Sequence, residues 1–110
     1  MSITFNELIS QQFLTTFDVK VPGIGQVELH QISSERAFEL TRNVAGLRGE
    51  ELELFVSAAA LSFVKGESPT DAEVTAFRAN VTPASLTFIF QKGLDSGVDV
   101  LEDLEATEKN

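Results

Sequence analysis

Few residues in this chain are of types that carry chemistry, and they do not form a catalytic pattern. His30 is the only histidine, and the chain has no Cys, Tyr or Trp. A catalytic histidine needs a nucleophile to activate or a carboxylate to orient it. His30 instead follows Glu28 on the polar side of an expected strand, which favours a solvated surface residue. A metal site built on these two residues would lack further ligands, so we expect no catalytic residue and no bound metal.

Three other features resemble ligand sites only in part. The segment PGIG at residues 22–25 lacks the third glycine of a dinucleotide-binding fingerprint and the Gly-Lys-Ser/Thr of a P-loop, so a hairpin turn explains it better. The carboxylates of residues 95–103 lack the alternating ligands and central glycine of a calcium loop. Glu50 and Glu51 suit the positive end of a helix dipole. The sequence therefore predicts no cofactor and no enzymatic activity.

Charge and composition exclude several kinds of partner. Seventeen acidic and eight basic residues give a net charge of −9, and the basic residues are spread singly, so no patch would attract a phosphate backbone. No segment approaches the roughly 18 consecutive apolar residues of a membrane span, and the first residues lack the pattern of a signal peptide. The absence of cysteine suits a reducing compartment such as the cytoplasm. We expect neither nucleic acid nor a membrane as a partner.

The spacing of apolar residues predicts a mainly α (α+β) fold with about five helices and one small N-terminal β-hairpin. Apolar and polar residues alternate over residues 17–31 around the PGIG turn, as in a hairpin. Periodic apolar residues and start signals predict helices over 4–14, from Ser33 to about Gly46, over 50–64, from Thr70, and from Thr82 to about Gly93. We expect one helical domain over 1–94 and an acidic, flexible tail over 95–110, with a sixth helix over 94–104 as the alternative.

Two of the expected helices carry more apolar surface than one small interior needs. The helix over 50–64 is apolar on nearly every side, which indicates a central helix or one covered by another subunit. The stripe of the helix over 4–14 is either part of the core or the surface of an arm that packs on a neighbouring subunit. A residue off the stripe of the fifth helix would need a partner if it is exposed. The candidate protein-interaction residues are Phe5, Leu8, Ile9 and Phe13 of the first helix and Phe88 of the fifth, and a homo-oligomer is expected.

Four segments follow one another in a characteristic order. A strand pair around a turn in DVKVPGIGQVELHQIS leads to a helix beginning SSERAFEL, then to an apolar helix with LFVSAAALSFV, then to two helices in TDAEVTAFRANVTPASLTFIFQKGLD. This order resembles the tail assembly chaperones of long-tailed, siphovirus-like bacteriophages over roughly residues 17–95. The resemblance consists of hydrophobic patterns and turn positions, without a catalytic signature.

The resemblance implies a non-enzymatic protein of the host bacterial cytoplasm that is absent from the mature virion. Members of that family are thought to bind and solubilise the tape measure protein and to help recruit tail tube subunits, and many also exist as a longer frameshifted product. Two other classes stay open: a small structural tail or connector protein of the virion, and an acidic adaptor or inhibitor that mimics nucleic acid. The lack of long strands disfavours a tail tube subunit, and the acidic excess of the tail disfavours a mimic, which needs ordered rows of carboxylates.

Overall fold

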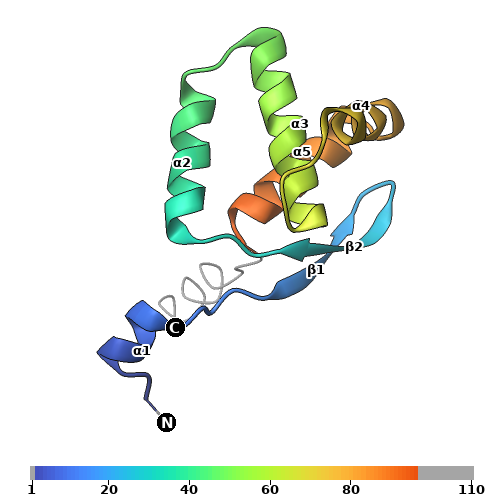
Figure 1. The fold of residues 1–110 in the computed structure, drawn as a ribbon. Helices are drawn as coiled ribbons and strands as arrows, with labels where there is room; N and C mark the ends of the chain where they lie inside the picture. The colour runs from blue at the N-terminus through green and yellow to red at the C-terminus, as the bar shows by residue number, and fades with distance from the viewer. Residues whose placement is uncertain (1, 97–110) are drawn as a thin grey trace, which may run out of the picture.

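A computed structural model describes residues 2–96 of the chain. Its elements are α1 (Phe5–Ser10), β1 (Thr16–Val21), β2 (Gly25–His30), α2 (Ser34–Ala45), α3 (Gly49–Lys65), α4 (Asp71–Asn80) and α5 (Pro83–Leu94) (Figure 1). The expected mainly helical fold with one N-terminal hairpin is confirmed. Helix α5 ends at Leu94, and the remainder of the expected acidic tail and of the alternative sixth helix, from residue 97 onward, lies outside the described residues.

Hydroxyl side chains set where four of the helices begin. The residue before the helix accepts a hydrogen bond from the backbone N–H three positions on, which satisfies a donor that has no partner inside the helix. These residues are Thr4 before α1, Ser33 before α2, Thr70 before α4 and Thr82 before α5. In α1 and α4 the side chains of Glu7 and Glu73 complete capping boxes, as the sequence predicted.

The first helix is shorter than the sequence predicted. The apolar pattern indicated a helix over 4–14, but α1 ends at Ser10 and the backbone of Gln11 is already extended. Isolated helices shorter than about 12–15 residues are marginal in water and depend on tertiary packing. None of the residues of α1 is buried, so no packing surface extends the helix, and Phe13 lies outside it.

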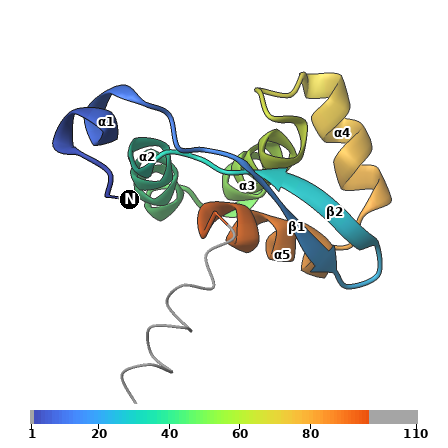
Figure 2. The ribbon, with the colours of Figure 1, turned by 90° about the horizontal axis from the view of Figure 1, so that it is seen from below.

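The hairpin supplies one apolar layer of the core. Strands β1 and β2 pair antiparallel, with Phe17 opposite Leu29 and Val19 opposite Val27. Val21 and Leu29 are buried, and Figure 2 shows the hairpin crossing α3 and α5, which both contact it. A two-stranded hairpin is marginally stable alone, so these helices hold it.

Helix α3 lies at the centre of the fold. It packs against β2, α2, α4 and α5, which agrees with the first of the two alternatives that its all-round apolar sequence left open, a central helix. At its contact with α5, the buried ring of Phe63 lies beside Phe90, with the ring centroids 6.2 Å apart. A Cβ atom placed on Gly93 would lie only 1.9 Å from Cδ2 of Phe63, so the two helices approach closely because residue 93 has no side chain.

Replacing Gly93 with alanine tests this contact. Alanine favours a helix by about 1 kcal/mol over glycine, but its methyl group would force Phe63 or the α5 backbone to move, and overpacking costs about 1–3 kcal/mol or more. We expect Gly93→Ala to lower the free energy of unfolding, measured by urea denaturation. Gly46→Ala is the control, because a Cβ there has ordinary contacts; equal stabilities for the two variants would contradict the close packing.

An ion pair between α3 and α4 predicts a pH dependence of stability. The Lys65 ammonium donates to Glu73 at 2.7 Å and the Thr70 backbone N–H donates to Glu73 at 2.8 Å, and in this order they lower the pKa of Glu73 from its ordinary value of 4.5. The carboxylate is therefore more stable in the folded chain than in the unfolded chain. The contribution of the Glu73 carboxylate to the free energy of unfolding is complete above its ordinary pKa. It is lost as the pH falls through the lowered pKa of the folded chain.

We expect Glu73→Gln to be less stable than the natural chain at neutral pH, with the difference shrinking as the solution is acidified. Urea denaturation over a series of pH values measures it. Glutamine keeps an acceptor for the Thr70 N–H, so the pH-dependent part reports the charge. If the difference in the free energy of unfolding between the two chains stays constant as the pH falls, the charge of Glu73 does not stabilise the fold.

Candidate protein-interaction site

The N-terminal arm, defined as residues 2–15, carries most of the exposed apolar side chains. It holds six of the nine large apolar side chains that are exposed in the described part of the chain, and these six are between 40% and 75% exposed. They are Ile3, Phe5, Leu8, Ile9, Phe13 and Leu14. Figure 1 shows α1, in dark blue, standing apart from the other helices. Large exposed apolar clusters on a protein surface mark interaction sites.

The structure excludes one of the two interpretations of the first helix, that of a core helix. Phe5, Leu8, Ile9 and Phe13 are all exposed, so the stripe belongs to a surface arm and not to the core of this chain. Ile3 and Leu14, for which the sequence made no prediction, are exposed apolar residues of the same segment. The partner that the arm contacts stays a prediction.

Hydrogen bonds fix the end of the arm that joins β1. The Thr15 N–H donates to the side-chain carbonyl of Gln31 at 2.9 Å, and the Gln31 N–H donates to the Thr15 carbonyl at 2.9 Å. The Gln31 side-chain amide donates to the carbonyl of Ser96 at 3.1 Å, and the Ile32 N–H donates to the Ser96 hydroxyl at 3.2 Å. The arm therefore leaves the domain at the end of α5, from a defined position.

Phe88 differs from the other candidate residues. It is half-buried and packs against the core cluster, and the Lys92 ammonium lies 5.6 Å from the centroid of its ring. The structure thus leaves only part of this ring for a partner, and its role in binding stays a prediction. Among the described residues outside the arm, the exposed aromatic side chain is that of Phe38 on α2, which is 68% exposed.

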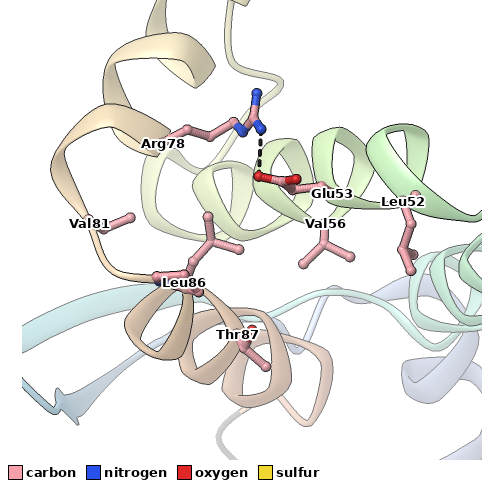
Figure 3. A pocket seen from close by; sticks show the side chains of 9 residues that line it. Leu52, Glu53, Val56, Arg78, Val81, Leu86 and Thr87 are labelled. Carbon is pink, nitrogen blue, oxygen red and sulfur yellow. Dashed lines mark hydrogen bonds and ion pairs between the residues drawn. The ribbon is translucent and has the colours of Figure 1, made fainter.

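A groove lies between three helices, and it was not expected from the sequence. We define it as the hollow of about 460 Å³ formed by the first half of α3, the end of α4 and the start of α5 (Figure 3). Its apolar side chains include Leu52, Val56, Val81 and Leu86. The Arg78 guanidinium lies 2.6 Å from the Glu53 carboxylate at its rim, which pairs the two charged groups that line it.

The surroundings of His30 differ from those that the sequence indicated. The half-buried imidazole lies against Gly66, where a Cβ atom would come within 2.9 Å of the ring, so it is more enclosed than the solvated residue that the sequence indicated. Across residues 2–96, no three His, Asp or Glu side chains gather in a way that could hold a metal ion. Within the same residues, no helix has the length and apolar character needed to cross a membrane.

Removing the arm tests its independence from the domain. Because α1 buries no residue, and surface changes away from packed features usually alter stability by no more than about 0.5 kcal/mol, we expect deletion of residues 2–14 to leave the free energy of unfolding nearly unchanged. Thermal denaturation followed by circular dichroism measures it. Loss of the cooperative transition would show that the arm belongs to the core.

None of the known protein families, curated proteins or solved structures with which the chain was compared matches it. The resemblance to tail assembly chaperones over roughly residues 17–95 therefore stays an expectation from the order of the elements. The exposed arm and the apolar groove are the two candidate binding surfaces of the described residues.

Proposed function

We propose that this protein is a non-enzymatic tail assembly chaperone of a siphovirus-like bacteriophage. It binds and solubilises the tape measure protein in the host cytoplasm and helps to recruit tail tube subunits. The single observation that carries the protein-binding role is the exposed apolar arm, with six large apolar side chains in residues 2–15. The resemblance over residues 17–95 supports the choice of this family among protein-binding proteins.

The arm has the chemistry to hold an amphipathic helix of a partner. Full burial of one Leu, Ile or Phe side chain is worth about 1.5–3 kcal/mol, so a few of these contacts suffice for a useful affinity after the entropic cost of association. Phe5, Leu8 and Ile9 follow the spacing by which one helix contacts another. A long helical tail protein that exposes apolar stripes would be covered by such contacts along its length.

Charge explains how the complex would stay in solution. The chain carries a net charge of −9, whereas the arm contains only one charged residue, Glu7. The apolar contact surface and the charged surface are therefore separate. A partner coated by several copies would gain negative charge with each copy, and net charge away from zero opposes aggregation.

The other two function classes have less support. A tail tube subunit needs long strands, whereas the hairpin has two strands of six residues each. A mimic of nucleic acid would bind through rows of carboxylates. The exposed side chains of residues 2–15 instead include six large apolar ones.

Co-expression with the tape measure protein tests the proposal. We expect the natural chain to keep that protein soluble and to co-purify with it, and Phe13→Asp to lower the recovered complex at least about tenfold, since losing 1.4 kcal/mol reduces affinity by a factor of ten. Phe13 is half exposed and lies outside the helices, so the substitution leaves the fold intact.

Phe38→Asp is the matched control, because Phe38 is an exposed phenylalanine on α2, outside the arm. It should co-purify as well as the natural chain. If the tape measure protein is insoluble with and without this chain, and the chain is present in purified particles, the structural class replaces the chaperone. Equal loss for both variants would show that the arm is not the specific binding surface.

A further inference from the structure

We propose that β1 of one copy pairs antiparallel with β1 of a second copy, so that the two hairpins form one four-stranded sheet. A two-fold axis would then pass between the two Val19 residues. This inference concerns the protein alone and does not depend on the chaperone role. The contact uses no residue of the arm, so the arm of each copy stays available to another protein. It gives the expected homo-oligomer a specific contact.

The edge of β1 that faces away from β2 carries unpaired backbone groups. In an antiparallel pair, alternate residues direct both backbone groups toward the neighbouring strand, and the residues between them direct both groups away from it. The Gln31 N–H donates to the Thr15 carbonyl, which fixes this alternation along the hairpin. The groups directed away from β2 are therefore those of Thr16, Asp18 and Lys20. Within residues 2–96, no other element forms a hydrogen bond with them.

Helix α5 leaves the start of β1 partly uncovered. This helix is the part of the helical body that packs most against β1. At its start, the Ser85 hydroxyl donates to the carbonyl of Pro22, which directly follows β1. Just after its end, Ser96 is bonded to the segment that follows β2. Because α5 runs from the end of β1 toward the end of β2, Val21 is 1% exposed, whereas Phe17 is half-buried.

The charges of β1 select one register for the pairing of two copies. Backbone hydrogen bonds between the two edges require residues 16, 18 and 20 of one copy to lie opposite residues of the same set. One such register places Asp18 opposite Lys20 of the second copy, and the two-fold axis repeats this pair. Moving the register by one step would place either the two Asp18 carboxylates or the two Lys20 ammonium groups opposite each other. Like charges directly opposite destabilise a sheet.

Within its own chain Asp18 has an unfavourable neighbour. Strand β2 places Glu28 directly opposite Asp18, so two carboxylates lie side by side on the exposed face. The ion pairs among residues 2–96 include neither Asp18 nor Lys20. Charged residues on an edge usually prevent pairing between copies, but an edge with one charge of each sign is complementary to itself. Lys20 of a second copy would therefore supply the cation that Asp18 lacks.

The apolar face of the sheet would also continue across the two copies. Residues that lie opposite each other point to the same face, so Val19 would face Val19, and Phe17 would face Val21 of the second copy. Phe17 and Val19 are both half-buried in the single chain. The pairing would cover part of the apolar surface that remains exposed on them. Since α5 begins beside the end of β1, it would lie next to Phe17 of the second copy.

Charge reversal at the two positions tests the pairing with purified protein. Asp18→Lys alone, or Lys20→Asp alone, replaces both attractive pairs by repulsive ones. Sedimentation equilibrium should show an association constant at least about tenfold lower than that of the natural chain. An equimolar mixture of the two variants should associate as the natural chain does, because each reversed charge then faces the opposite charge on the other variant. Both positions are exposed, and circular dichroism checks that each variant keeps the fold.

The two variants separate this contact from general charge repulsion. Asp18→Lys makes the net charge of the chain less negative, so general repulsion alone would let this variant associate more tightly. Tighter association of Asp18→Lys would therefore overturn the proposal. A natural chain that stays a monomer up to about 1 mM would also overturn it, as would a mixture of the variants that associates no more tightly than either variant alone.

A cysteine at position 19 tests the register, since the chain has no cysteine of its own. The two Val19 residues would form a pair without backbone hydrogen bonds, whose Cα atoms lie about 4.5 Å apart, within the range of a disulfide. The two Thr16 residues would lie about 20 Å apart.

Under mild oxidation we expect Val19→Cys to form a covalent dimer at least about tenfold faster than Thr16→Cys, as measured by mass spectrometry. Thr16 is the more exposed of the two positions, so chance collisions would favour the control. Equal rates, or a faster reaction of Thr16→Cys, would overturn the register. None of these measurements involves the tape measure protein, so their failure would leave the outcome of the co-expression experiment unchanged.

Discussion

The close contact between α3 and α5 at Phe63 and Gly93 is the constraint on which the rest of the structure depends. The ring of Phe63 occupies the space that any side chain at position 93 would need, and it lies beside Phe90 in the buried core. This contact sets how the two helices lie against the hairpin. The same two helices form two walls of the groove, and Ser96, just after α5, holds the segment from which the arm leaves. The positions of both candidate binding surfaces therefore follow from one packing contact.

The distribution of apolar residues connects this core to the proposed function. A chain of 110 residues has a small interior, and the core is built from α3, α5 and the hairpin with a single buried residue from α2, Leu40. The apolar residues of the arm find no place there and stay exposed. A protein that acts alone gains nothing from such a surface and risks aggregation. A protein that covers the apolar helices of another protein, or that joins copies of itself, needs it.

Most of the elements could be predicted from the sequence because their signals are local. The hydroxyl caps at Thr4, Ser33, Thr70 and Thr82 act over three residues, and the alternation around PGIG is a property of the strands themselves. The end of α1 depends on tertiary packing, and residues 11–14 are exposed, so the apolar periodicity predicted a helix that extends too far, to residue 14. The half-burial of Phe88, the enclosure of His30 by Gly66 and the groove each depend on how separate helices meet. No local pattern encodes these arrangements.

Hydrogen exchange of the arm amides, with and without the tape measure protein, tests most directly whether the arm is the binding surface. A short exposed helix with few tertiary contacts opens at little cost in free energy, so its amides should exchange rapidly in the free protein. We expect the amides of residues 5–14 to become strongly protected in the complex, while those of α3, which is already in the core, change little. Rapid exchange throughout the arm in a stable complex would contradict it and would place the binding surface elsewhere on the protein.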